Sequence, residues 1–219
     1  VLGDVGGTGP VSMDYSFDRM AIASGGNLFY WNGSALTQVT DPDLGTVLDV
    51  LFVDGYFMTT DGEFLVVTEL NDPTSVDPVK YGSSEADPDP VKGMAKLTRE
   101  VYALNRYTTE VFQNIGGSGF PFQRVDGAQV MRGAIGTHTF CPLAGTLAFL
   151  GSGRNEAPGV YLINGGASVP ISTREIDTIL EGYTESQLAD VVVESRVHKK
   201  HELLLIHLPD KCLQYDVNA

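Results

Sequence analysis

Short segments that alternate apolar and polar residues recur along the chain, and most of them come in pairs. The members of a pair are joined by a short turn rich in Gly, Asn and Asp, the pattern of an antiparallel β-hairpin. Five hairpins are predicted, pairing Met20–Ser24 with Leu28–Trp31, Tyr56–Thr60 with Glu63–Thr68, Val101–Leu104 with Glu110–Gln113, Val160–Ile163 with Ser168–Ile171, and Leu203–Leu208 with Cys212–Tyr215. Leu36–Val39 adds a third strand to the first pair. In the second pair, Asp61-Gly62 predicts a two-residue turn with positive φ at both positions.

The spacing of these hairpins predicts propeller blades. Their turns are centred near residues 33, 61, 107, 165 and 210, an average separation close to the roughly 40 to 50 residues of a blade. Further apolar segments precede the hairpins at Leu48–Val53, Met94–Leu97, Leu147–Leu150 and Val191–Val197. Such small sheets cover their faces by stacking around an axis. We therefore predict an all-β fold, a complete or partial β-propeller of antiparallel three- to four-stranded blades, as a single domain over residues 1–219. A sandwich of two sheets shares this local pattern and is the alternative.

Two stretches depart from the strand pattern. Ser172-Thr-Arg-Glu175 has the form of a capping box before apolar residues at helical spacing, and Thr184-Glu-Ser-Gln187 offers a second one. Together they predict one short helical insertion near residues 173–189. The stretch Asn71–Pro90 contains Pro73, Pro78, Pro88 and Pro90. Because proline lacks the N–H that a β-ladder needs, we expect a protruding, irregular loop there.

Composition and charge narrow the possible functions. Of the 219 residues 25 are Gly and 42% are hydrophobic, which suits a turn-rich chain with a real core. The 14 basic and 28 acidic residues give a formal charge of −14, which repels phosphate, so sequence-specific binding of nucleic acid is not expected. Apolar runs are far shorter than the ~20 residues of a membrane span, so no membrane insertion is expected. For Cys141 and Cys212, two buried thiols are favoured over a disulfide.

Several residue groups look reactive, yet each is accounted for by local structure. The sequence Asp4-Val-Gly-Gly-Thr8 is similar to the phosphate-binding loop of sugar kinases. Because the other nucleotide-binding motifs of those enzymes are missing, we interpret this sequence as a glycine turn. Lys199 and Lys200, between His198 and His201, disfavour a bound cation. Four aspartates lie beside prolines: Asp41, Asp43, Asp87 and Asp89. Their carboxylates are the type of group that binds calcium or forms the acid pair of a glycosidase. Because aspartate next to proline commonly starts a turn, we interpret them as turn formers. We predict no catalytic set, no metal and no cofactor.

The segment Phe120-Pro-Phe122 places two aromatic rings on a glycine-flanked loop that has few ways to bury them. Exposed aromatic residues of this kind are typical of a docking point for another subunit. A loop folded over the end of a blade is the alternative.

Longer strings of the chain resemble a known family. The resemblance is carried by DGYFMTTDGEFLVVTELNDPTSVDPVKYGSSEADPDPVKGM (54–94), EVYALNRYTTEVFQNIGGSGFPFQRVDGAQVMRGAIGTHTF (100–140), LAFLGSGRNEAPGVYLI and STREIDTIL. These strings resemble the packaged-DNA stabilisation protein, or tail-hub accessory factor, of short-tailed bacteriophages. The likeness extends from about residue 41 to residue 216. Family members are considerably longer, and the first residue is Val1 rather than Met, so we expect a piece of a longer protein or a shortened relative.

The resemblance implies a non-enzymatic virion component that is added after genome packaging. It implies a homo-oligomeric ring beneath the portal adaptor that closes the DNA exit channel, retains the DNA and supports the tail needle and tailspikes, in the host cytoplasm during assembly and in the virion tail afterwards. An acidic wall suits this role because DNA does not adhere to it. Contacts with partners are expected on the loops 71–90 and 116–124, at Tyr81, Asp87, Asp89, Phe120, Phe122 and Arg124. The alternative function is a glycan-binding or glycan-hydrolysing propeller that uses Asp87 and Asp89.

Overall fold

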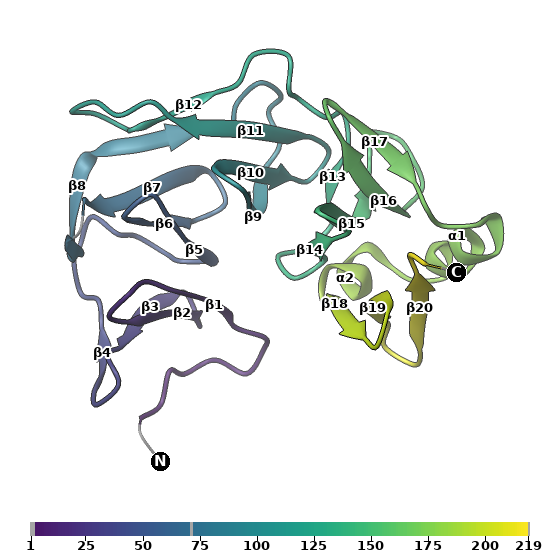
Figure 1. The fold of residues 1–219 in the computed structure, drawn as a ribbon, viewed down its shortest axis with the longest axis horizontal. Coiled ribbons are helices and arrows are strands. Elements are labelled where there is room, and N and C mark those ends of the chain that lie inside the picture. Colours follow the sequence, from purple (N-terminus) through teal and green to yellow (C-terminus); the bar gives the residue numbers. More distant parts are fainter. Residues whose placement is uncertain (1–2, 71, 219) are drawn as a thin grey trace.

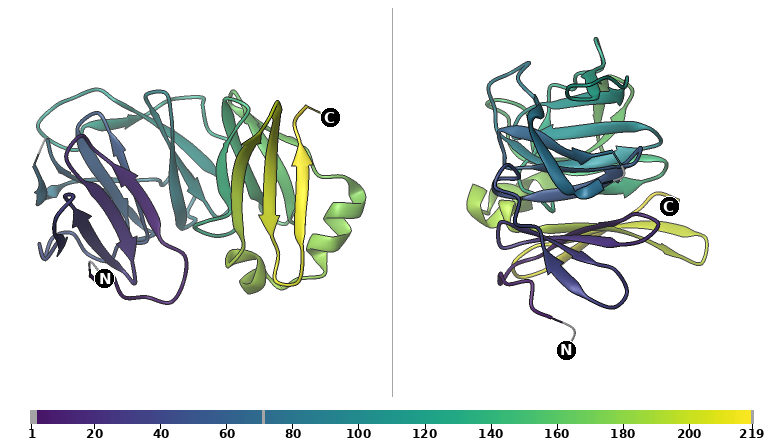
Figure 2. Two further views of the ribbon diagram at one scale, coloured as in Figure 1. Left: turned by 60° about the horizontal axis from the view of Figure 1, so that its bottom comes forward. Right: turned by 90° about the vertical axis from the view of Figure 1, so that its left-hand side faces the viewer.

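The computed structural model describes residues 3–70 and 72–218 of the chain. Within them, the strands form five separate antiparallel sheets that follow one another along the sequence. The sheets are arranged along an arc, each with its first strands toward the inside, as blades of a propeller (Figures 1 and 2). The predicted all-β propeller is therefore confirmed, and the two-sheet sandwich is wrong.

Blades 1, 2 and 3 each contain four strands in sequence order. Blade 1 consists of β1 (Ser12–Tyr15), β2 (Met20–Ser24), β3 (Asn27–Trp31) and β4 (Leu36–Gln38). Blade 2 consists of β5 (Asp49–Val53), β6 (Tyr56–Thr60), β7 (Phe64–Glu69) and β8 (Asp72–Ser83). Blade 3 consists of β9 (Val91–Leu97), β10 (Glu100–Asn105), β11 (Thr109–Asn114) and β12 (Phe122–Arg124).

Blades 4 and 5 depart from this plan. Blade 4 consists of β13 (Gly133–Ala134), β14 (Phe140–Leu143), β15 (Thr146–Ser152), β16 (Gly159–Asn164) and β17 (Ala167–Pro170). The inner edge of this sheet is formed by two short strands instead of one, because β13 and β14 pair with different parts of β15. Two helices, α1 (Arg174–Glu181) and α2 (Glu185–Ala189), lead to blade 5, which consists of β18 (Val192–His198), β19 (His201–His207) and β20 (Cys212–Asp216). No helix in the described part of the chain is long and apolar enough to cross a membrane.

The hydrophobic core is divided among the contacts between neighbouring blades. One cluster joins blades 1 and 2 through Leu28 and Phe57, and a second joins blades 2 and 3 through Leu65 and Val101. A third lies between blades 3 and 4, and the fourth, between blades 4 and 5, also takes in Leu180 of α1 and Leu188 of α2. Each blade therefore depends on its neighbours for burial of its faces, as expected for stacked sheets too small to fold alone.

The predicted helical insertion near residues 173–189 is confirmed, and it consists of the two short helices α1 and α2. The capping box at Thr184 is confirmed, because its Oγ1 accepts from the N–H of Gln187 while the Gln187 side chain accepts from the N–H of Thr184. The box predicted at Ser172 is wrong: the first helix is capped by Thr173, without a side-chain bond. Ser172 Oγ instead accepts from the N–H of Val160, at 3.1 Å. The Ser172 hydroxyl is therefore bonded to β16 of blade 4 and does not cap the helix.

The irregular loop predicted at Asn71–Pro90 is mostly a strand. Asn71 itself lies outside the described residues, but β8 runs from Asp72 to Ser83 and pairs with β7, with shifts of register along it. The strand is the outer edge of blade 2, so one side of its backbone needs no ladder partner. Prolines are tolerated on such an edge. Only residues 84–90 remain without regular structure.

Two local expectations also need correction. The turn at Asp61 is longer than two residues: Asp61 Oδ1 accepts from the N–H groups of Glu63 and Phe64, and of the Asp-Gly pair only Gly62 has a positive φ, at 100°. Cys141 is buried as predicted, but Cys212 is exposed, since it lies on the edge strand of blade 5. Both thiols are free.

Candidate functional site

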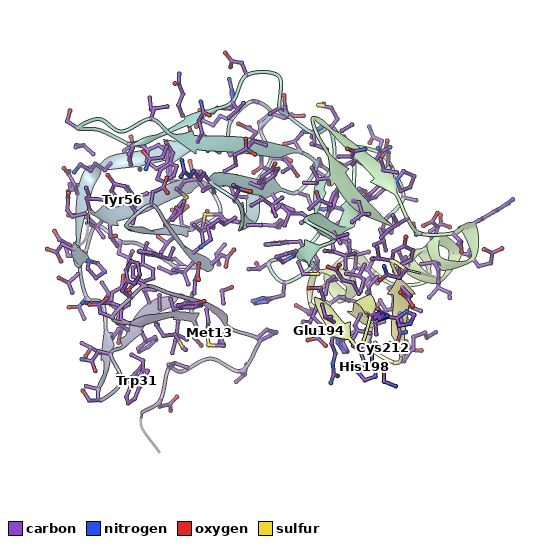
Figure 3. All side chains as sticks on the ribbon, viewed as in Figure 1. Met13, Trp31, Tyr56, Glu194, His198 and Cys212 are labelled. Carbon is purple, nitrogen blue, oxygen red and sulfur yellow. The ribbon has the colours of Figure 1, made fainter. Side chains whose placement is uncertain are left out.

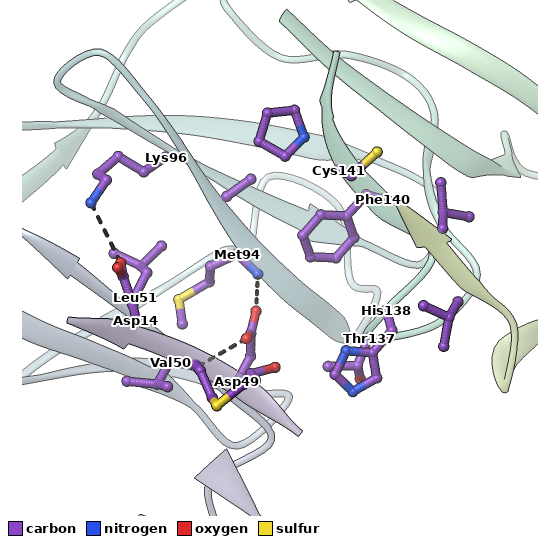
Figure 4. A pocket seen from close by; sticks show the side chains of 16 residues that line it. Asp14, Asp49, Val50, Leu51, Met94, Lys96, Thr137, His138, Phe140 and Cys141 are labelled. Carbon is purple, nitrogen blue, oxygen red and sulfur yellow. Dashed lines mark hydrogen bonds and ion pairs between the residues drawn. The ribbon is translucent and has the colours of Figure 1, made fainter. Parts of the chain in front are cut away.

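A cavity of about 360 Å³ lies on the inner side of the arc. Its walls come from the inner strands of all five blades, β1, β5, β9, β14 and β18, together with the segment that precedes β14 (Figure 4). We call it the axial cavity. Every propeller blade directs its first strand toward the axis, so residues distant in sequence meet there.

Asp49 is the most buried charged group of the axial cavity. Its side chain is aligned by two backbone donors, Met94 N at 2.7 Å from Oδ2 and Val50 N at 2.9 Å from Oδ1. Burial raises the pKa of Asp49 to about 6, while bonds from Met94, Ser12 and Val50 act in the opposite direction. The carboxylate therefore connects the inner strands of blades 2 and 3.

A second polar contact connects three inner strands. Asp14 of β1 accepts a hydrogen bond from Phe52 N of β5 at 2.6 Å. Lys96 of β9 donates to the carbonyl oxygen of Phe52 and lies 3.4 Å from Asp14 Oδ2 (Figure 4). Between blades 4 and 5, Val193 N donates to the carbonyl of His138 at 2.8 Å, and burial lowers the pKa of the His138 imidazole. The polar groups around the cavity thus bind one blade to the next.

Another polar cluster joins blades 3 and 4 to α2. The Arg106 guanidinium donates to Glu185 Oε1 at 2.7 Å and to Ser152 Oγ at 3.1 Å. It also lies over the Tyr107 ring, 4.4 Å from its centroid, and Arg154 lies 5.1 Å from the same centroid. No sequence motif indicated Arg106, because its partners are supplied by elements far along the chain.

The two aspartates of the predicted contact set are engaged within the protein. Asp89 is buried and accepts from the N–H groups of Tyr107 and Thr108 and from Thr108 Oγ1, at 2.6 to 3.0 Å. The oxygens of Asp89 therefore stabilise the turn between β10 and β11, and its contact with a partner stays a prediction. Asp87 pairs with Arg154 at 2.7 Å. It remains partly accessible, and its contact with a partner stays a prediction.

The expectation that Phe120 and Phe122 have few ways to be buried is wrong. Phe122 is only 4% exposed. The centroid of its ring lies 6.0 Å from the ring centroid of Tyr56 in blade 2 and 5.8 Å from that of Phe120. Phe120 lies over Gly82, where a Cβ would come within 2.3 Å of Phe120 Cε1. The rings close the contact between blades 2 and 3, and Gly82 is the feature that makes room for them.

Tyr81 and Arg124 remain accessible. Tyr81 is exposed on β8 and packs edge-on against Phe64 at 5.0 Å. Arg124 has a half-exposed side chain and pairs at 3.4 Å with Glu110, whose side chain is fully buried. Asp87 and Phe120 are partly accessible as well. The contacts of these four residues with a partner stay predictions. No group of three or more His, Cys, Asp or Glu that could hold a metal occurs among residues 3–70 and 72–218.

Comparison with known proteins identifies the family. Residues 1–219 match a family model described as bacteriophage P22 Gp10, beta-propeller. This chain belongs to that family. A curated relative, the tail hub protein gp10 of Salmonella phage P22, is 30% identical over 236 residues, covering 100% of this chain and 50% of the relative. The chain thus spans about half the length of the curated relative it matches.

Solved structures outside the family share the fold at low sequence identity. The Pan2 WD40 domain of Neurospora crassa superposes with a TM-score of 0.54 at 13% identity, covering 96% of this chain and 63% of that one. PorZ, a bacterial surface component of the type-IX secretion system of Porphyromonas gingivalis, gives a TM-score of 0.51 at 14% identity, covering 97% and 28%. These likenesses concern the propeller architecture only. The predicted resemblance to the phage tail-hub family is confirmed by the family match.

Proposed function

We propose that this chain is a non-enzymatic structural part of a phage tail hub, which closes the channel below the portal after packaging and retains the genome in the virion. The observation that carries the proposal is family membership over residues 1–219. The arrangement of charged groups supports it. Asp14, Asp49, Lys96 and Arg106 are held in hydrogen bonds between blades, as a rigid scaffold requires.

Charge provides a second argument. The formal charge of −14 gives the protein little affinity for DNA. In our proposal the hub retains DNA by obstruction, and the DNA slides past an acidic wall during ejection. The 219 residues act as a propeller domain of this hub, assembled as a homo-oligomeric ring with the portal adaptor, the tail needle and the tailspikes. The ring assembles in the host cytoplasm and resides in the virion tail.

The glycan-binding or glycan-hydrolysing alternative receives no support from its proposed carboxylates. The oxygens of Asp89 are occupied by backbone and hydroxyl donors, and Asp87 is paired with Arg154.

Deletion of the gene from its phage tests the proposal. Without the protein, particles should package DNA and then lose it, as measured by nuclease-protected DNA per particle, and electron micrographs should show incomplete tails. Complementation with the intact gene should restore both. Particles that keep their DNA and complete tails without this gene would refute the role.

A substitution on the accessible surface tests the assembly contact separately. Tyr81→Ala removes a half-exposed ring from an edge strand, so the monomer should stay folded while ring or tail assembly weakens. Sedimentation of the hub with its tail partners measures the change. Val169→Ala, at another exposed position on an outer strand, is the control that should leave assembly unchanged. Equal assembly by both variants would remove Tyr81 from the contact surface.

A further inference from the structure

A second cavity, of about 440 Å³, lies at the outer junction of blades 1 and 2. Its walls come from β4, the outer strand of blade 1, and from the beginning of β8, the outer strand of blade 2. Figure 3 shows Trp31, the residue that follows Tyr30 on β3, on the side of blade 1 away from the axial cavity. We call the second cavity the rim cavity. Its volume falls within the ~300 to 1,000 Å³ typical of small-molecule sites.

The rim cavity is lined by a tyrosine whose hydroxyl has no hydrogen-bond partner within the part of the chain that the structure describes. This residue, Tyr30, is only 5% exposed, and its ring centroid lies 5.2 Å from that of Phe57. The Arg19 guanidinium covers the ring at 5.6 Å from its centroid. An unpartnered buried hydroxyl costs free energy, and such groups in native proteins nearly always have a partner. The rim cavity is the place where a ligand can supply one.

Two neighbours of Tyr30 bring further hydrogen-bonding groups to the same cavity. Thr37 is directly opposite Tyr30 in the pairing of β3 with β4, so the two side chains share a face of the sheet. The Thr37 hydroxyl can both donate and accept. Asn32 Oδ1 accepts from the N–H of Ala35 at 2.9 Å, so the NH₂ group of Asn32 is the part of its amide that remains for a ligand. The rim cavity thus offers uncharged donors and acceptors together.

The charged residues in the wall are already engaged with protein groups. Arg19 donates through Nε and Nη2 to the carboxylate of Asp18, with a shortest distance of 2.5 Å. Asp41 accepts from the N–H of Asp43 at 3.0 Å and from that of Val76 at 3.2 Å, which connects the segment after blade 1 to β8. An anion would have to displace Asp18 from Arg19, and a cation would lie beside the guanidinium. The rim cavity therefore favours an uncharged ligand.

We propose that the rim cavity binds a neutral saccharide, whose hydroxyl groups bond with Tyr30, Thr37 and Asn32. Each sugar hydroxyl both donates and accepts a hydrogen bond, which matches a wall that carries uncharged groups of both kinds. Val39 in the same wall provides an apolar contact for the C–H groups of the sugar ring. The site is separate from the aspartates considered above for a glycan, and it adds ligand binding to the structural role.

Saturation-transfer NMR on the unaltered protein tests the proposal with sugars of similar size. The neutral probes are glucose, galactose, mannose and N-acetylglucosamine, and the charged probes are protonated glucosamine and glucose 6-phosphate. We expect at least one neutral sugar to bind, and to bind more tightly than both charged sugars. No transfer to any neutral sugar would overturn the proposal. Tighter binding of glucosamine or of glucose 6-phosphate would also overturn it, because the site would then select a cation or an anion.

Substitutions connect the binding to the rim cavity. Tyr30→Phe removes only the hydroxyl, so the dissociation constant of the bound sugar should rise about tenfold. Thr37→Val should weaken binding in the same direction. Tyr102→Phe is the matched control, because its hydroxyl donates to Glu100 Oε2 at 3.0 Å in blade 3, and this variant should bind the sugar with wild-type affinity. Unchanged affinity of Tyr30→Phe, or equal weakening by Tyr102→Phe, would place the sugar elsewhere and refute the site.

Stability without sugar provides an independent check on the Tyr30 hydroxyl. Because this hydroxyl has no partner in the described part of the protein, Tyr30→Phe should unfold in urea at the wild-type midpoint or above it. A clearly lower midpoint would show that the hydroxyl is bonded within the folded chain, and would contradict its availability to a ligand.

Discussion

Arg106 Nε lies 2.7 Å from Glu185 Oε1, although the two residues are 79 positions apart in the chain. Arg106 belongs to the turn between β10 and β11, and Glu185 is the first residue of α2. The Arg106 side chain is mostly buried, whereas that of Glu185 is largely exposed. The pair therefore fastens the helical insertion to blade 3 through a guanidinium whose other bond is made to Ser152 of blade 4.

Arg106→Ala should lower the free energy of unfolding by about 2 to 3 kcal/mol, because a buried charge-assisted set of hydrogen bonds is lost. Urea denaturation of the two proteins measures the difference. Arg154→Ala is the matched control: it also contacts Tyr107, but its half-exposed side chain makes a surface pair with Asp87 worth less than about 1 kcal/mol. Equal losses for the two variants would show that Arg106 does not join the blades.

Asp49 should make stability depend on pH in an unusual direction. Burial raises the pKa of Asp49 from 3.8 to about 6 in the folded protein, so between these pH values the folded state binds the proton more tightly than the unfolded state. Stability from this group is present below pH 3.8 and is lost as the pH rises through about 6. The loss is on the order of 2 to 3 kcal/mol.

Comparison with Asp49→Asn isolates that contribution. The unfolding free energy of the wild type minus that of Asp49→Asn should be largest near pH 4 and should decrease toward pH 6.5. Glu156 provides the opposite control, because its bond to Arg132 lowers the pKa of the carboxyl; the stabilisation it gives is present above pH 4.5 and lost on acidification. A difference between wild type and Asp49→Asn that stays constant over this range would contradict the burial of an ionisable Asp49.

Phe122→Ala should destabilise the propeller itself, by about 3 to 5 kcal/mol, since the ring is buried between blades 2 and 3. Phe120→Ala should cost less, because its ring is only half-buried. Thermal or urea unfolding gives both values. If the Phe122→Ala protein unfolded with the wild-type midpoint but failed to assemble, the aromatic pair would be a docking point after all.

Gly82 and Phe120 should show energetic coupling. A Cβ at residue 82 would lie 2.3 Å from Phe120 Cε1, so Gly82→Ala must displace that ring. We expect a loss of about 1 to 2 kcal/mol for Gly82→Ala, and a loss at least about 1 kcal/mol smaller when Phe120→Ala is already present. Gly119→Ala, where a Cβ meets nothing within 4 Å, is the control. Additive effects in the double-mutant cycle would show that the two residues do not touch.

Local patterns in the sequence were enough to predict most of the hairpins and the propeller. Alternation of polar and apolar residues reports directly on the two faces of a strand, and glycine in a turn reports on backbone conformation. The Thr184 capping box was predictable for the same reason, because its partners lie within three residues. Strand β8 was missed because prolines are local signals against a strand, and only its place at the edge of blade 2 makes them harmless.

The sequence by itself determined most of the β-hairpins and the strong negative charge. The tertiary structure alone decided which polar residues are buried and which aromatic rings remain available. Asp89 and Phe122 had the appearance of surface residues until the turn of blade 3 and the side of blade 2 were placed against them. The physical reason is that burial of a side chain depends on neighbours contributed by other blades, tens of residues away, whereas periodicity within a strand carries information about that strand only.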